Sequence, residues 1–227
     1  MTFDGNISFP AFSGDLVKME DIGNTSVQKF DDKAFDAMRS GSYLPRLQLM
    51  TSNSEKCKAG EFPINHYALV LDQSHNDLGL SVDVLVIAWR PKAMSIGDQV
   101  VSAYDHESEL FKSIQEKAEQ PNSGAMWGYE YLIWLPGIKK FCTFFMGSKS
   151  ARREAPQVKA RLGKAATLSS KKIETSSFTW FAPKCSDCST PFEMPEREAF
   201  AHEVERFNNP AKSEVEVAPA PATTRAQ

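Results

Sequence analysis

The sequence predicts a mostly β or α+β domain, built as a small antiparallel barrel with peripheral helices and a disordered C-terminal tail. Three observations lead to this class. Residues 82–89 are almost all apolar and often β-branched, which is typical of a central strand buried on both faces. Residues 129–135 and 139–146 have the pattern of a hairpin that turns through Pro136-Gly137-Ile138. Turns and loops, rather than long helical crossovers, separate most strand signals, so an antiparallel barrel is favoured, and a sandwich fits as well.

The elements divide the chain into four regions. Residues 1–40 are expected to form an irregular arm and a short helix at 26–39, where apolar residues recur at helical spacing. Residues 41–190 form the β-rich core, 191–209 a C-terminal helix, and 210–227 a tail without apolar residues to bury. The expected core strands are 43–50, 66–71, 82–89, 129–135, 139–146, 165–171 and 173–181.

Two helices are expected inside the core region. Residues 106–119 place Leu110, Phe111 and Ile114 on an inward face. Residues 148–162 follow Ser148, which can cap a helix, but Pro156 stands in the middle, so two short turns explain this segment equally well.

Two segments are expected to lie outside the strands. The Asn, Asp and Gly residues of 72–80 predict a turn, and Arg90-Pro91-Lys92 is expected to end the strand 82–89.

Length and composition restrict the class of protein. A chain of 227 residues with 41% hydrophobic residues can build one sizeable domain with tails. No stretch approaches the ~18 consecutive apolar residues of a membrane span, and the first residues do not have the pattern of a secretory signal. A cytoplasmic location (the host cytoplasm for a viral protein) and no membrane partner are therefore expected.

The cysteines and histidines offer little to a metal or a cofactor. Cys185-x-x-Cys188 has half the spacing of a zinc site, but no second pair exists, so free thiols and no cofactor are expected. Phosphate-binding loops and hydrolase motifs are absent, so we expect a protein without catalytic activity. A metal-dependent nuclease remains an alternative, since Asp83 lies in an apolar strand and Glu130 and Lys139 could join it.

The distribution of charge is the strongest functional signal. Residues 139–172 contain ten Lys or Arg and one acidic residue, a formal charge of +9 in a chain of net charge −3. Aromatic strand-like runs, 129–134 and 141–145, precede and begin this basic block. Cations that follow phosphates, beside rings that stack on bases, are how proteins hold single-stranded nucleic acid. An amphipathic helix with a solvated basic face on an aromatic sheet would give the same pattern.

The candidate binding residues are the cations and rings of these segments: Trp89, Arg90, Lys92, Tyr129, Tyr131, Lys139, Lys140, Lys149, Arg152, Arg153, Lys159, Arg161 and Lys164. Strand alternation puts Tyr129 and Tyr131 on one face and Trp134 on the other, and either face could turn to the core. A groove forms only where cations and rings share a face. Reversing Arg152 and Arg153 to Glu is expected to weaken binding with little loss of stability.

The basic and aromatic runs 131–136 and 140–155, in a compact β domain followed by a tail, resemble the single-stranded DNA-binding proteins of tailed bacteriophages. The resemblance covers residues 40–185. It implies an OB-type barrel and sequence-tolerant binding of single-stranded DNA during replication or recombination, with replication or recombination proteins as further partners and no catalysis. The tail departs from this family, because its last ten residues contain no acid.

A virion structural or assembly protein is the competing class. The basic block would then meet an acidic neighbouring subunit, and the absence of catalytic motifs would be explained equally well. The sequence leaves open the oligomeric state and the choice between DNA and RNA.

Overall fold

The computed structural model describes residues 44–71, 74–96, 100–121, 123–175, 179–190 and 194–209. The chain divides into the units Met1–Tyr43 and Leu44–Gln227, and all described residues belong to the second. The predicted helix at 26–39 and the predicted tail at 210–227 lie outside the described residues.

Within the described residues, nine strands form one sheet. They are β1 (Arg46–Leu49), β2 (Tyr67–Leu71), β3 (Ser74–Gly79), β4 (Val82–Ile96), β5 (Val100–Ala103), β6 (Ala125–Leu135), β7 (Lys140–Met146), β8 (Ala165–Glu174) and β9 (Thr179–Asp187). Their order is β3-β2-β1-β7-β6-β4-β8-β9, with β5 paired to β4. The helices are α2 (Glu55–Lys58), α3 (Glu109–Ala118), α4 (Lys149–Lys159) and α5 (Arg197–Asn208).

The mostly β class is confirmed, but the sheet is mixed and open. β1 and β7 pair in parallel, whereas the other neighbouring strands are antiparallel. β3 and β9 end the strand order without pairing to each other, so the barrel does not close.

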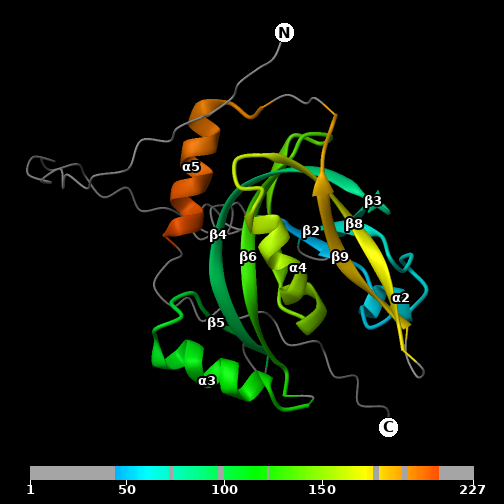
Figure 1. Ribbon diagram of the computed structural model, residues 1–227, viewed down its shortest axis with the longest axis vertical. Coiled ribbons are helices and arrows are strands. Elements are labelled where there is room, and N and C mark those ends of the chain that lie inside the picture. Colours follow the sequence, from blue (N-terminus) through cyan, green and yellow to red (C-terminus); the bar gives the residue numbers. More distant parts are fainter. Residues whose placement is uncertain are drawn as a thin grey trace, which may run out of the picture. The chain divides into compact units, whose positions relative to one another are not determined.

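The sheet bends round its core. The hydroxyl of Tyr67 in β2 donates to the carbonyl of Ser169 in β8 at 2.7 Å, although four strands stand between β2 and β8 in the sheet. Figure 1 shows the long, bent strands β4 and β6 with α4 lying against them. Ala151, Ala155 and Val158 of α4 are buried in the same cluster as the inward side chains of seven strands, so α4 fills the concave side.

Two predictions of turns and strand ends are wrong. Residues 74–79 form β3, which pairs with β2, because a polar edge strand lacks the apolar alternation used to find strands. β4 continues through Pro91 to Ile96. β4 pairs with β8 only up to Leu85 and with β5 only from Ala93, so β6 is its one strand partner beside Pro91. A proline has no N–H to donate, and it is tolerated here because one side of β4 is unpaired at this point.

Pro156 does not divide α4 into two turns. α4 is one continuous helix from Lys149 to Lys159, capped by Ser148, whose hydroxyl accepts from the amide of Ala151. Pro156 is exposed, and the hydroxyl of Tyr131 donates to the carbonyl of Ala155 at 2.7 Å, which ties this turn to the sheet. In α3, Phe111 and Ile114 are buried as predicted, whereas Leu110 is exposed.

None of the helices in the described segments is long and apolar enough to cross a bilayer.

The buried phenols predict loss of stability at alkaline pH. Burial raises the pKa of Tyr67 and of Tyr131, so both keep their protons in the folded protein after the unfolded chain has lost them. The free energy of unfolding should therefore fall above about pH 10, by up to about 1.4 kcal/mol per pH unit for each phenol. Urea midpoints measured between pH 8 and 11 should fall less steeply for Tyr67→Phe than for the wild type. Equal slopes would contradict this.

Candidate nucleic-acid interface

The two faces of the β4–β6 ladder carry different groups. On the concave face, Trp89 is the cross-strand partner of Tyr131, and Tyr129 lies two residues before Tyr131 in β6. On the convex face, Arg90 is the partner of Glu130. A β-bulge at Ile87, between the pairs of Val86 and Ala88, sets this arrangement. Without the extra residue, the alternation that turns Val86 to the core would also turn Arg90 to it.

Two cations of α4 lie over aromatic rings of the concave face. The Cζ of Arg152 is 4.3 Å from the ring centroid of Trp127, and the Nζ of Lys159 is 3.6 Å from that of Trp89. Because Arg152 and Lys159 are two helical turns apart, they project from the same side of α4. The rings of Trp89 and Tyr129 are 5.8 Å apart and tilted by 58°. We call this surface the α4 flank; it consists of Trp89, Trp127, Tyr129, Lys149, Arg152, Arg153 and Lys159.

Arg152 is fixed by the backbone. Its guanidinium donates to the carbonyl of Trp127 at 3.0 Å and to that of Gly147 at 2.7 Å, so it joins β6 to the start of α4. The approach of these two chain segments needs Gly128, where an added Cβ would lie 2.1 Å from the carbonyl oxygen of Met146. Arg152 thus positions α4, and reversing its charge is expected to cost stability, contrary to the expectation from sequence.

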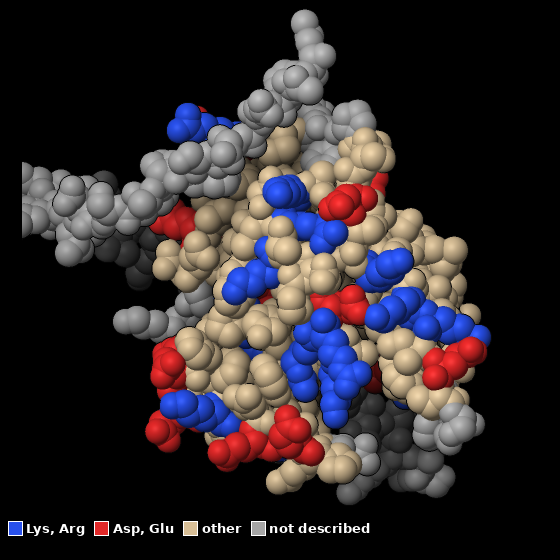
Figure 2. Space-filling view, in the orientation of Figure 1, with Lys and Arg blue, Asp and Glu red and all other residues tan. Residues whose placement is uncertain are grey.

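Other cations of the α4 flank remain available. Lys149 and Arg153 are exposed and make no ion pair within the described residues. Lys164, in the turn after α4, is also exposed. Figure 2 shows Lys and Arg side chains gathered over the middle of this face, where α4 lies, while acidic side chains gather towards α3. The field on this face therefore attracts anions to α4.

The opposite side of α4 is occupied by ion pairs. Glu154 of α4 pairs with Lys171 of β8, and Arg161, in the turn after α4, donates to Asp187 of β9 at 3.0 Å. These contacts join α4 to the β8–β9 hairpin, so Arg161, although a candidate from sequence, is already engaged. Lys139 and Lys140 lie at the β6–β7 turn, where Lys139 has a φ of 51°.

Arg90 and Lys92, two further candidates, lie on the convex face in a buried ionic cluster. The carboxylate of Glu130 accepts from Arg90 at 2.6 Å and from Lys92 at 2.7 Å, and its own side chain is only 3% exposed. Arg90 also donates to the carbonyl of Phe207 at the end of α5 and stacks on Tyr104. Burial alone would lower the pKa of Lys92, but the Glu130 carboxylate outweighs burial and the pKa is raised. This cluster holds α5 on the sheet, and the sheet separates it from the α4 flank.

Tyr131 lies in the core, fully buried beneath α4, so it offers no ring to a ligand. Trp127, in contrast, was not among the residues selected from sequence, because the strand was predicted to begin only at Tyr129. The alternation that places Tyr129 and Tyr131 on one face would also place Trp127 there, once the strand is known to begin at Ala125.

The nuclease candidates do not come together with a metal-binding set. In the described ranges, no group of three or more His, Cys, Asp or Glu side chains is placed to hold a metal ion. Asp83 accepts from the hydroxyl of Thr167 at 2.6 Å, and Glu130 is held by its two cations. Cys185 is buried in β9, and the thiol of Cys188 lies 3.6 Å from the carbonyl of Thr190.

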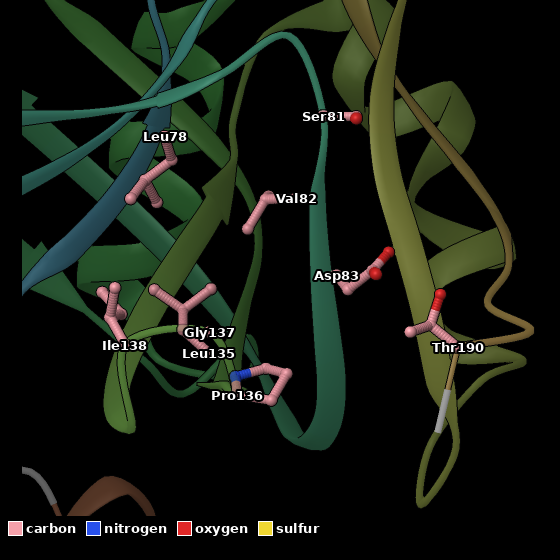
Figure 3. Close-up of a pocket in the computed structure, with 9 residues that line it drawn as sticks. All are labelled: Leu78, Ser81, Val82, Asp83, Leu135, Pro136, Gly137, Ile138 and Thr190. Atoms are coloured by element: carbon pink, nitrogen blue, oxygen red, sulfur yellow. The ribbon is translucent and has the colours of Figure 1, made fainter. Parts of the chain in front are cut away.

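A hollow of about 440 Å³ lies between the β6–β7 turn and the start of β4. Figure 3 shows Leu78, Val82 and Ile138 on one side of β4 and Asp83 and Thr190 on the other. Its polar groups thus point away from its apolar wall, and the hollow offers no convergent set of ligand-binding groups.

Comparison of the chain with protein-family models, curated proteins and solved structures finds no match.

Proposed function

We propose that this protein binds single-stranded nucleic acid, with DNA as the favoured form, along the α4 flank. The observation that carries the proposal is the placement of cations directly over half-buried rings on one face. Two further cations of the same helix, Lys149 and Arg153, make no ion pair with any residue that the structure describes. Phosphates would be held by Lys149, Arg153 and Lys159, and bases would meet the rings of Trp89 and Tyr129. Every base has a π-face, so such binding tolerates any sequence.

The preference for a single strand follows from the recessed rings. Trp89 and Tyr129 are partly buried and packed against the core, so a base must leave its own stack to reach them. Bases of a duplex are stacked and paired, and unstacking one costs a few kcal/mol.

The proposal includes the wider role that the resemblance to phage proteins implies. This role is non-catalytic binding of DNA in replication or recombination, in which the bent sheet holds the strand as an OB-type barrel would. Open, strongly bent antiparallel pairing around β4, β6 and β7 is compatible with that use.

Charge reversal on the α4 flank tests the proposal. Lys149→Glu with Arg153→Glu is expected to lower the affinity for a labelled single strand of roughly 30 nucleotides by at least about tenfold. The log–log dependence of affinity on salt should become shallower by about 1.4, since two single-strand phosphate contacts are lost. Fluorescence anisotropy at two salt concentrations, with duplex as competitor, measures both.

The matched control is Lys56→Glu with Lys58→Glu on α2, which changes the net charge equally and should leave affinity nearly unchanged. Equal losses of affinity in the two double variants would show that only the net charge of the protein matters, and would contradict a site on α4. No binding by the wild type at low salt would exclude the function; particles that form without nucleic acid would then favour an assembly role.

A further inference from the structure

We propose that Lys159 is a phosphate-operated gate over Trp89. This inference rests on the proposed function and deepens it. In the free protein the ammonium covers the ring; a strand's phosphate draws the ammonium away, and a base then takes its place on the indole. Lys159 would thus make base stacking depend on a charged backbone.

The contact of Lys159 is the first support. Its Nζ lies 3.6 Å from the ring centroid of Trp89, which is direct contact with the π-face. Lys159 is otherwise exposed, and no carboxylate in the described part of the chain pairs with it. Among the described residues, the ring of Trp89 is therefore the group that holds the ammonium at this position.

The ring has no other free approach on its inner side. Trp89 packs against the main hydrophobic core and against Tyr129, whose ring is 5.8 Å away. In the proposed complex, a base that stacks on Trp89 takes the place of the ammonium over the ring. An exposed cation–π contact contributes about 0.5–1 kcal/mol. Moving the Lys159 ammonium off the ring therefore costs little free energy once a phosphate pairs with it. The long, flexible stem of lysine lets Nζ move while α4 stays in place.

Arg152 and Trp127 form a similar pair that cannot open in this way. The guanidinium of Arg152 is fixed by the carbonyls of Trp127 and Gly147 as well as by the ring. Moving it would leave two backbone acceptors without their donor. Of the two covered rings, only Trp89 is therefore open to exchange, and Trp127 keeps its cation when ligand binds.

The gate predicts a ligand class. A nucleobase oligomer with a neutral backbone must displace Lys159 without offering it an anion. Such an oligomer should bind much more weakly than a phosphate-containing strand of the same sequence. It loses the general electrostatic attraction, and it also has to displace Lys159 from Trp89 without a phosphate to receive the ammonium.

The test compares Lys159→Ala with the wild type on two probes: a single-stranded DNA and a peptide nucleic acid of identical sequence. Alanine removes the cation and also leaves no side chain long enough to cover the ring, whereas a methionine could pack its sulfur on it. Lys159→Ala should lose DNA affinity, with a salt slope shallower by about 0.7. It should gain affinity for the neutral oligomer by about two- to fivefold, the equivalent of the removed cation–π contact.

Lys149→Ala is the matched control, since Lys149 lies on the same helix and no ring contact is seen for it within the described residues. It should lose DNA affinity to a similar extent and gain nothing for the neutral oligomer. The gate alone would be overturned if the wild type binds DNA normally but Lys159→Ala gains no affinity for the neutral oligomer, or if Lys149→Ala gains as much. Absence of DNA binding by the wild type would overturn the proposed function and the gate together.

Discussion

Replacing Gly128 with alanine is expected to lower the free energy of unfolding by about 3 kcal/mol, at the upper end of the usual cost of overpacking. The added Cβ would lie 2.1 Å from the carbonyl oxygen of Met146 and 2.9 Å from the Cα of Gly147. Both neighbours are backbone atoms, so no side chain can rotate to make room. β6 would have to move away from the end of β7, which would also separate the two carbonyls that Arg152 joins. Urea unfolding followed by circular dichroism measures the loss.

Gly137→Ala is the control for this substitution. Gly137 lies in the β6–β7 turn, and no atom comes within 4 Å of a Cβ added there. The urea midpoint of the Gly137→Ala protein should stay close to that of the wild type. A Gly128→Ala protein as stable as Gly137→Ala would contradict the close approach of β6 to the end of β7 at Gly128.

Glu130→Gln is expected to have a comparable effect, a loss of about 3 kcal/mol. The side chains of Arg90 and Lys92 are only 16% and 13% exposed, and Glu130 is their shared carboxylate. The amide keeps the shape of the carboxylate but leaves two buried cations without a negative charge. Because Arg90 also bonds to the end of α5, this helix should lose protection from amide hydrogen exchange first.

The control for the carboxylate is Glu154→Gln. Glu154 pairs with Lys171, whose side chain is 47% exposed, so the loss of this pair should cost less than about 1 kcal/mol. Equal costs at Glu130 and Glu154 would contradict the assignment of Glu130 to a buried ionic cluster.

Local patterns in the sequence were sufficient for much of the fold. The β6–β7 hairpin, the central position of β4 and the Ser148 cap of α4 were all predicted, because turn chemistry, β-branched runs and capping depend on neighbouring residues. The parallel pairing of β1 with β7 and the open end of the sheet were not, since they depend on contacts between distant segments.

The candidate site depended on features that sequence patterns do not contain. Alternation placed Tyr129 and Tyr131 on one face but could not show that α4 covers Tyr131 completely. The bulge at Ile87 reverses the faces of the residues after it, so Arg90 could not be placed on the convex face by counting. The basic block likewise gave no indication that Arg161 is engaged in an ion pair, whereas Lys149 and Arg153 make none within the described part of the chain.

Photo-cross-linking tests the central claim, that single-stranded nucleic acid lies along the α4 flank, most directly. A single strand of roughly 30 nucleotides carrying 5-bromouracil would be irradiated with the full-length protein, and the attached peptides would be identified by mass spectrometry. We predict attachment at Trp89 or Tyr129, greatly reduced in the Lys149→Glu, Arg153→Glu protein. Attachment confined to other segments, or equal attachment in that variant, would contradict the account.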